Sequence, residues 1–552
     1  MASDGRGMPV PPDLETRLSA IRASEPAAMA LPRTRRAWFL PHWHEIVLVL
    51  LLAGAFGFCL TTTLHHDVSW YLVATNRLLD GALLYVDIIE VNPPLAFYLT
   101  MPPVAFARLT GIAPAACFIG YVFLLIAVSL FLIRRLLDRQ AALSAGYRSV
   151  MLLAAATALA VAPIGVFGQR EHLMLIFALP YLLLMSARIA DQGCDRRFAA
   201  VIGLFAAIGF CLKPHFFLVP ALPELYLAAQ RRSPSAVFRP ESWSLLAAAV
   251  LYALFVAVAH PQYFDVVLPN ALLVYDAYSS SLRAILLQPS LYVLAPVAAV
   301  YAVLRSIGIA QRRTDAFAAA TIGAFAGYVL QAKGWPYQLL PTTAIACLAA
   351  VAMLAETVAE ERLTQGTRLL SLAAGGGALI LPLFALAAGG TYRNPVAPSL
   401  LPAVEKYADG GTIYAFTSYV SVGFPLVNEA HVRWASRFPA QWLLPGALRH
   451  LAHPQSLDPD QEARLRQIER YATEAVIEDL ARAPPDLVIV DKSRGYYGDL
   501  QFDALAYFGR SARFAEFWRP YLKIGDVNLT IGGTRLEFEL WCRRNAARHC
   551  TG

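Results

Sequence analysis

Four short polar segments interrupt a mostly apolar sequence, and they contain the residue types that can do chemistry. The first contains His66 and Asp67, and Asp87 and Glu90 follow soon after. A carboxylate beside an apolar segment is partly desolvated, which would raise its pKa and suit it to act as a general base toward a hydroxyl group. Asp67 could equally cap the helix expected to follow it, as aspartates often do. Position alone leaves both roles open.

The second polar segment, Gly168 to His172, lies between two apolar stretches with almost no loop to solvate it. A functional interpretation assigns a binding or catalytic role to Arg170, Glu171 and His172, since ionisable groups in such a setting often have perturbed pKa values. The structural alternative is a tight turn that places Glu171 at a helix N-terminus, where the helix dipole favours its charge.

The third and fourth segments are centred on Lys213 and Lys333, which are the only lysines before residue 390. Tyr337 follows Lys333 closely. An ammonium group at a membrane boundary suits a phosphate or diphosphate, which it can bind as a point charge. The alternative is a lysine that extends from a helix end to water and needs no ligand.

Composition indicates which class of protein must position these groups. Of the 552 residues, 57% are hydrophobic and 15% charged, which is too apolar for a soluble chain to bury. The formal charge of +7 could suggest nucleic acid, but the basic residues lie in short clusters between apolar runs. They are therefore expected to set membrane topology, with lipid as the surroundings and no nucleic acid as a partner.

Apolar runs long enough to cross a bilayer predict a polytopic α-helical membrane protein of about eleven transmembrane helices. A crossing helix needs about 20 apolar residues. The first run has no features of a cleavable signal peptide, so we expect it to remain as a helix. The expected crossings are 46–64, 113–133, 149–168, 171–187, 198–212, 215–230, 243–259, 284–304, 315–331, 338–355 and 369–388.

The distribution of basic residues predicts the orientation. The N-terminal tail and every second connection are rich in arginine, and such segments face the cytoplasm. An odd number of crossings then places the C-terminal part outside. The Ala- and Arg-rich composition fits a bacterial inner membrane, so we expect the C-terminal part in the periplasm. The expected domains are a cytoplasmic tail at 1–44, a transmembrane domain at 45–389 with a first outer loop at 65–112, and an extracytoplasmic domain at 390–552.

The first outer loop is expected to be helical. The segment from Pro93 to Leu109 is apolar but contains four prolines, and counting it as a crossing would place the later arginine clusters outside. We therefore predict two helices, 68–80 and 93–109, along the outer surface. The apolar residues expected at the membrane interface are Trp70, Tyr71, Leu72, Leu78 and Leu79.

After Gly390 the composition changes to that of a small α/β domain. Strands are predicted at 412–417, 487–490 and 536–540, and a charged helix at 459–482. If this domain lies outside the cytoplasm, Cys542 and Cys550 could form a disulfide.

Taken together and in order, these segments resemble the GT-C glycosyltransferases, the class of the protein O-mannosyltransferases and lipid A aminoarabinose transferases. The resemblance covers about residues 45–390. The segments that carry it are Asp67, Tyr71, Leu78-Leu79-Asp80-Gly81, Tyr85-Val86-Asp87 and Pro93-Pro94 in the first outer loop, then Gln169 to Met174, Gly209 to Pro214, and Lys333 to Pro341.

The resemblance implies transfer of a sugar from a polyprenyl-phosphate donor to an acceptor on the outer face, with inversion and without a nucleotide sugar or other cofactor. Asp67 would be the general base, with Glu171 and Asp87 as further catalytic candidates. The substrate-binding candidates are His66, Arg170, His172, Lys213, Lys333 and Tyr337. A divalent metal at His66 and Asp67 stays open but is not favoured.

Two other functions remain open from the sequence. A transporter or lipid flippase for envelope glycan intermediates also has many helices and few intramembrane charges, although no pair of related halves is evident. A non-catalytic scaffold in polysaccharide assembly would use the outer domain instead. Aromatic residues of that domain could stack on sugars, although in a small domain such residues more often belong to the core; they are Trp434, Trp442, Tyr496, Tyr497 and Trp518. The acceptor could be a glycan, a lipid or a protein.

Overall fold

The computed structural model describes residues 43–544 except 293, 311, 360–363, 374–375, 378–389 and 532. The chain divides into two compact units, Met1–Val49 and Leu50–Gly552. The described residues of the first unit are helical. All of the contacts discussed below lie within the second unit.

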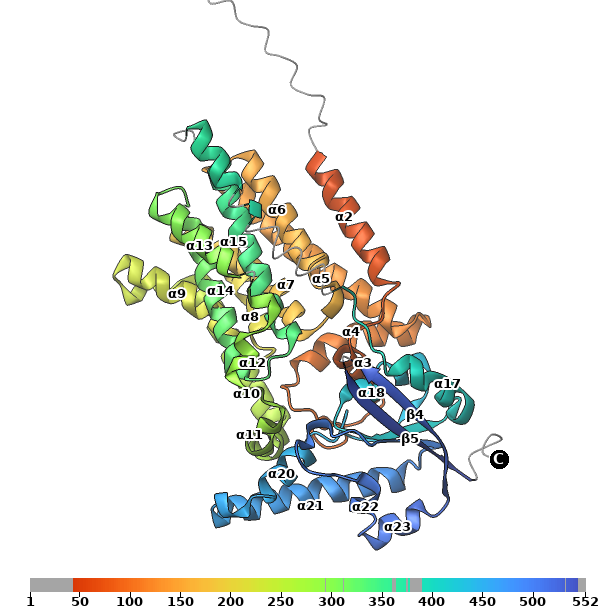
Figure 1. The fold of residues 1–552 in the computed structure, drawn as a ribbon. Helices are drawn as coiled ribbons and strands as arrows, with labels where there is room; N and C mark the ends of the chain where they lie inside the picture. Colours follow the sequence, from red (N-terminus) through yellow and green to blue (C-terminus); the bar gives the residue numbers. More distant parts are fainter. Residues whose placement is uncertain are drawn as a thin grey trace, which may run out of the picture. The chain divides into compact units, whose positions relative to one another are not determined.

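Helices form most of the chain up to residue 359 (Figure 1). The α-helices are α2 (Trp43–Cys59), α3 (His66–Leu79), α4 (Leu95–Thr110), α5 (Pro114–Asp138), α6 (Ala145–Ala160), α7 (Arg170–Ile189), α8 (Arg196–Phe210), α9 (Leu218–Arg231), α10 (Pro240–Ala259), α11 (Leu268–Val274), α12 (Leu282–Leu286), α13 (Leu294–Ser306), α14 (Arg312–Gln331) and α15 (Leu340–Ala359). Short turns of other helix types join them at η1 (Ile164–Val166), η2 (Pro214–Phe217), η3 (Pro234–Val237), η4 (Tyr263–Val267), η5 (Tyr275–Tyr278), η6 (Pro289–Leu291) and η7 (Pro336–Leu339).

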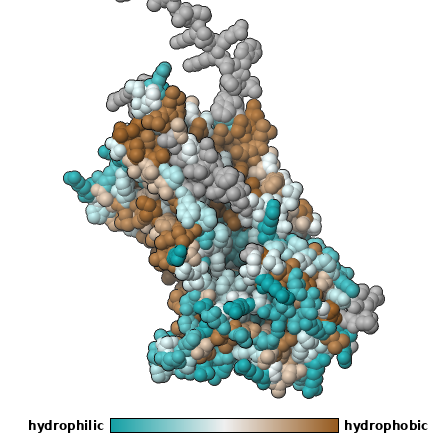
Figure 2. All heavy atoms as spheres, viewed as in Figure 1, coloured by the Kyte–Doolittle hydropathy of each residue, from teal (hydrophilic) through white to brown (hydrophobic). Residues whose placement is uncertain are grey.

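Among the described residues, five helical segments are long and apolar enough to cross a membrane. The one that forms α7 is almost wholly buried and packs against α5, α8 and α14, whereas α10 is mostly exposed. Leucines such as Leu251 and Leu254 on α10 are exposed. Such side chains would be unfavourable in water, but in a membrane lipid would cover them. Figure 2 shows hydrophobic residues gathered over the helical part and hydrophilic residues over the C-terminal part. The helical part is therefore that of a multi-pass membrane protein.

Most of the expected crossings coincide with a helix, but one of them is broken. The segment 284–304 forms α12, η6 and α13 rather than one helix. The break follows from Pro289, because the residue before a proline is disfavoured in helical conformation, and Gln288 is extended. The expected crossing 369–388 lies largely outside the described residues, so the number of eleven stays a prediction.

Both helices expected in the first outer loop are present, as α3 and α4. The predicted exposure of the first one is wrong in part, because Trp70, Tyr71 and Leu72 are buried. Trp70 packs edge-on against Phe424, with ring centroids 5.3 Å apart. The C-terminal part of the chain thus covers the face of α3 that the sequence pattern assigned to the membrane interface.

The C-terminal part contains a five-stranded mixed sheet with the strand order β2-β1-β3-β5-β4. β1 is parallel to β2 and β3, whereas β3 and β4 are antiparallel to β5. The strands are β1 (Thr412–Phe416), β2 (Arg433–Trp434), β3 (Leu487–Asp491), β4 (Tyr521–Ile531) and β5 (Thr534–Arg543). The surrounding helices are α17 (Ala397–Ala408), α18 (Val420–Gly423), α19 (Leu426–Glu429), α20 (Leu444–Leu451), α21 (Pro459–Arg482), α22 (Ala504–Phe508) and α23 (Ala512–Trp518), with short turns η8 (Pro454–Ser456) and η9 (Gly495–Tyr497).

The sequence predicted three of these strands and the helix α21. β1 and β3 are fully or almost fully buried, which explains their continuous apolar runs. α21 begins with a capping box in which Asp458 and Gln461 satisfy each other's backbone N–H groups. Cys550 lies outside the described residues, so its disulfide with Cys542 stays a prediction.

Hydrogen bonds fasten the C-terminal part to the first outer loop. The Asn428 side chain donates to the backbone oxygen of Ser69, and Arg77 donates to that of Ser436 at 2.6 Å. The backbone N–H of Ile89 donates to the oxygen of Arg437 at 2.8 Å. The first outer loop is therefore held between the helical part and the sheet, and the candidate site lies at this junction.

Candidate functional site

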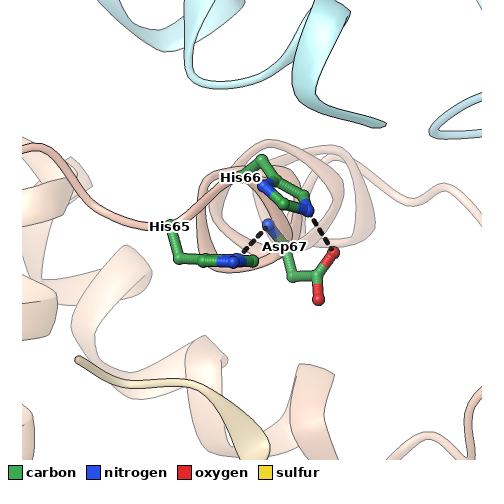
Figure 3. A group of neighbouring side chains, drawn as sticks. All are labelled: His65, His66 and Asp67. Carbon is green, nitrogen blue, oxygen red and sulfur yellow. Dashed lines mark hydrogen bonds and ion pairs between the residues drawn. The ribbon is translucent and has the colours of Figure 1, made fainter. Parts of the chain in front are cut away.

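The first polar segment forms the start of α3 (Figure 3). His65 occupies the N-cap position, and its side chain accepts the backbone N–H of Asp67. The alternative in which Asp67 caps this helix is therefore wrong. Its carboxylate points away from the helix backbone and lies 3.6 Å from the His66 imidazole.

Asp67 meets the second polar segment across a sequence distance of 103 residues. Its Oδ2 lies 3.3 Å from the guanidinium of Arg170 and accepts a hydrogen bond from the Gln169 amide at 3.1 Å. Arg170 also donates to the Tyr71 hydroxyl at 3.0 Å. Because Arg170 is buried, this is a charge pair largely shielded from water, where electrostatic forces act more strongly.

The start of α7 is positioned by close packing at Gly168. This residue has a φ of +75°, and the ring of Phe118 occupies the space that a Cβ atom would need. The backbone N–H of Gly168 donates to Nδ1 of His172, so that Nε2 carries the proton that bonds to the oxygen of Leu159. Both ring nitrogens of His172 thus stabilise the turn that presents Arg170.

Charged neighbours set the ionisation of Asp67. Burial opposes ionisation, but His66, His65 and Arg170 hold the pKa of Asp67 below its ordinary value. Burial lowers the pKa of His66, so this imidazole is neutral at pH 7 and Arg170 supplies the permanent positive charge. The expected raised pKa of Asp67 is therefore wrong, because desolvation is outweighed by the two imidazoles and the guanidinium beside the carboxylate.

Asp67 and Arg170 line a cavity of about 290 Å³ at the junction of the helical part and the C-terminal part. His66 and Tyr337, two of the substrate-binding candidates from the sequence, also line it. The sequence named Trp442 and Tyr496 only as aromatic residues able to stack on sugars. The lining residues beyond the four predicted ones complete the wall. They are His65, Trp70, Tyr71, Glu90, Val91, Asn92, Tyr275, Tyr278, Trp335, Pro336, Ser418, Tyr419, Val420, Ser421, Pro439, Ala440, Trp442 and Tyr496.

Glu90 is the second carboxyl group in the cavity wall. It accepts hydrogen bonds from the Trp70 indole at 3.0 Å and from the Asn92 amide. Burial raises the pKa of Glu90, although Arg170 and the two hydrogen bonds oppose the shift. Glu90 and Asp67 therefore have pKa values shifted in opposite directions, an arrangement common in active sites. In the sequence, the only signal for Glu90 was its position in the first outer loop close to Asp67 and Asp87.

Lys213 and Glu171 form an ion pair beneath the cavity wall. The ammonium lies 2.6 Å from Glu171 Oε1, and both side chains are buried. Lys213 also lies 5.8 Å from the ring of Tyr337, which lines the cavity. Neither charged group is among the lining residues, so the structure places both next to the site rather than in its wall.

Lys333 and Asp87 are tied to other parts of the molecule. Lys333 donates to the backbone oxygen of Tyr275 and lies 3.3 Å from the Ser279 hydroxyl, which fixes the loop that carries Tyr275. Asp87 accepts the N–H of Leu83 and lies 3.6 Å from Arg482. Neither residue lines the cavity, and neither does His172.

His65, His66 and Asp67 are the one group in the described part of the chain with the spacing of metal ligands. Their candidate ligand atoms lie within 4.8 Å of one another. However, His65 accepts a backbone N–H, and Arg170 and Gln169 already donate to Asp67 Oδ2. A second cation would have to compete with the guanidinium, so these residues fit a metal ion poorly.

Comparison with known proteins gives matches among solved structures. No protein-family model matches the chain, and no curated protein sequence matches it. The crystal structure of ArnT from Cupriavidus metallidurans bound to undecaprenyl phosphate is 11% identical, with 91% of this chain and 98% of that chain covered and a TM-score of 0.50. Its apo state is 13% identical, with 90% and 97% covered and a TM-score of 0.49. The mycobacterial arabinofuranosyltransferase AftD is 15% identical, with 92% of this chain and 40% of that chain covered and a TM-score of 0.44.

The likeness to the first ArnT structure extends over almost the full length of both chains. This chain therefore has the GT-C fold, and the resemblance inferred from its sequence is confirmed at the level of the fold. At such low identity the likeness says nothing about individual residues. The case for a function depends on the cavity itself.

Proposed function

We propose that this chain is a membrane glycosyltransferase that moves a sugar from a polyprenyl-phosphate donor to an acceptor on the periplasmic face. One observation carries the proposal. A carboxylate and a buried guanidinium, from distant parts of the chain, meet 3.3 Å apart in the wall of a cavity. The GT-C fold supports the same class of reaction, because ArnT, which binds undecaprenyl phosphate, shares it.

The reaction follows from these two groups. The acceptor hydroxyl attacks the anomeric carbon on the face opposite the phosphate, and the bond between that carbon and the phosphate oxygen breaks with inversion. Asp67 takes the hydroxyl proton, and the bonding electrons leave on the lipid phosphate. Arg170 stabilises this anion as it forms, which is a large contribution when the cation is fixed and shielded from water.

Asp67 and the donor phosphate then compete for one guanidinium. In the free protein His66, His65 and Arg170 keep the pKa of Asp67 low, which makes the carboxylate a weak base. A bound phosphate diester neutralises part of the charge of Arg170, so the pKa of Asp67 rises toward its ordinary value. Donor binding would thus activate the base at the moment when it is needed.

The test is a transfer assay with purified protein in lipid nanodiscs. A panel of polyprenyl-phosphate sugars is incubated with candidate glycan, lipid and peptide acceptors, and release of polyprenyl phosphate is measured. We expect Asp67→Asn to lower the rate by about 10²–10⁴, the usual contribution of a general base, while binding of polyprenyl phosphate is retained. Asp80→Asn is the matched control, because Asp80 lies at the opposite end of the same helix and pairs with Arg108. Equal activity of the two variants would exclude Asp67 as the base.

A further inference from the structure

A group of five aromatic side chains forms one wall of the cavity. This aromatic wall consists of Tyr275 and Tyr278 from η5, and Tyr419, Trp442 and Tyr496 from the C-terminal part. The rings touch one another: the centroids of Tyr278 and Tyr496 are 4.2 Å apart, and those of Tyr419 and Tyr496 are 5.0 Å apart. The rings therefore form a continuous surface rather than isolated contacts.

Two polar atoms of the aromatic wall are unsatisfied. The Tyr278 hydroxyl and the Trp442 indole N–H have no hydrogen-bond partner in the described parts of the chain, although both side chains are more than nine-tenths buried. A buried donor without a partner costs free energy, so native proteins usually satisfy it with protein, water or a ligand. Both residues line the cavity, but the two polar atoms themselves are almost fully shielded, so a bound ligand reaches them only after a small side-chain rotation.

Other tryptophans of the C-terminal part differ in this respect. The indole N–H of Trp434 donates to the oxygen of Phe438, and that of Trp541 donates to Glu539. Trp518 packs among Phe514, Tyr521 and Trp541 and does not line the cavity. These tryptophans pack or form hydrogen bonds within the C-terminal part, whereas Trp442 combines an unsatisfied donor with a place in the cavity wall.

Charge is distributed unevenly around the cavity. Among its lining residues, the acidic and basic side chains are Asp67, Glu90 and Arg170. The residues that the C-terminal part contributes are all uncharged. A phosphorylated acceptor would need a second cation beside the aromatic wall, because Arg170 is already committed to the donor phosphate in the proposed reaction.

We infer that the acceptor is an uncharged glycan whose terminal sugar binds on the aromatic wall; this inference rests on the proposed transferase function. The apolar face of a sugar ring packs on aromatic rings, and its hydroxyl groups can accept from Tyr278 and Trp442. The same placement sets the acceptor hydroxyl between the aromatic wall and Asp67. A phosphorylated lipid and a peptide are the competing acceptors.

The test compares acceptors of matched size and different charge. With a donor that the wild-type protein consumes, the acceptors are uncharged trisaccharides of mannose, galactose, glucose and arabinose, a diphosphorylated glucosamine disaccharide lipid, and a serine-rich peptide. Donor hydrolysis without any acceptor is measured separately. Tyr278→Phe and Trp442→Phe each remove one hydrogen-bonding group and keep an aromatic ring. Tyr507→Phe is the matched control, because its hydroxyl bonds to Glu469 outside the cavity.

We expect an uncharged trisaccharide to be the acceptor. Each variant of the aromatic wall should raise the acceptor KM roughly tenfold, the effect of one lost hydrogen bond to a bound ligand, with an unchanged donor KM. The inference is overturned if the phosphorylated lipid or the peptide is the acceptor, or if both variants behave like Tyr507→Phe. If no donor is consumed or hydrolysed, the proposed function itself is wrong and the inference falls with it.

Discussion

Arg170 interacts with the carboxylate of Asp67, the hydroxyl of Tyr71 and, in the proposed reaction, the phosphate of the donor. A single guanidinium can satisfy several partners because it has five N–H donors. Its Nε atom has no partner in the described part of the chain.

The pH dependence of activity tests this competition. In the free protein the pKa of Asp67 is depressed, so its carboxylate stays ionised until the pH falls below its ordinary range. The acid limb of kcat/KM for the donor reports the protein without donor, and the acid limb of kcat reports the donor complex. The first limb should therefore lie at lower pH than the second. Arg170→Gln removes the cation and should move the limb of kcat/KM to higher pH. A limb that Arg170→Gln leaves in place would contradict this explanation.

The ion pair between Lys213 and Glu171 leads to a second prediction, on thermal stability and on affinity for polyprenyl phosphate. Removing one partner of a buried pair leaves an uncompensated charge, which costs about 3–5 kcal/mol. We expect Lys213→Met to lower the thermal unfolding midpoint strongly, and the double variant Lys213→Met/Glu171→Gln to recover most of the loss. The double variant should also retain affinity for polyprenyl phosphate if Lys213 only supports the wall. Restored stability with lost affinity would instead show that Lys213 binds the phosphate.

At the scale of elements, the site depends on how α20 packs against the end of α11. The position of a Cβ atom on Gly446 would be 2.0 Å from the backbone oxygen of Val274. Val274 directly precedes η5, which carries Tyr275 and Tyr278 of the aromatic wall. Trp442 of the same wall lies just before α20. This close approach therefore aligns two parts of the wall.

Gly446→Val should push these elements apart. Overpacking of this kind usually costs about 1–3 kcal/mol, and here it should also raise the acceptor KM, since the two parts of the aromatic wall separate. Gly525→Ala is the control, because a Cβ atom there meets nothing within 4 Å. Thermal unfolding and acceptor kinetics of the two variants provide the comparison. An unchanged KM in Gly446→Val would mean that this contact does not shape the site.

At the scale of the whole molecule, the orientation in the membrane stays a prediction from the arginine-rich connections. The prediction places the C-terminal part outside the cytoplasm, where a lipid-linked sugar and an envelope acceptor would meet. The cavity lies between the helical part and the C-terminal part, so its side of the membrane is that of the sheet.

Cysteine labelling tests the orientation. Ser456 lies in the C-terminal part and is exposed, and Ser233 lies in an arginine-rich connection and is partly exposed. On right-side-out vesicles a membrane-impermeant maleimide should label Ser456→Cys directly, and Ser233→Cys only after permeabilisation. The wild-type protein, with its native cysteines, gives the background. The reverse pattern would place the cavity in the cytoplasm and exclude periplasmic transfer.

The sequence by itself determined that the first part of the chain is helical and that the C-terminal part contains a sheet. It also indicated the polar segments around Asp67 and Arg170, which line the cavity. Apolar runs and strand patterns depend on nearest neighbours along the chain, so α7, α21, β1 and β3 could be predicted from local residues. Asp67, Arg170, His66 and Tyr337 were also identified, because polar residues between apolar runs are visible without coordinates.

Only the tertiary structure decided which of these residues share a cavity. The sequence suggested a raised pKa for Asp67, but the two neighbouring imidazoles and a guanidinium from 103 residues away lower it. It treated Trp70 and Tyr71 as interface residues, whereas the C-terminal part and Arg170 cover them. Distances across the fold fix electrostatics and burial, and no local pattern contains those distances. For the same reason the sequence could offer Trp442 and Tyr496 for stacking on sugars, but the aromatic wall, assembled from four separate segments, could be found only in the folded protein.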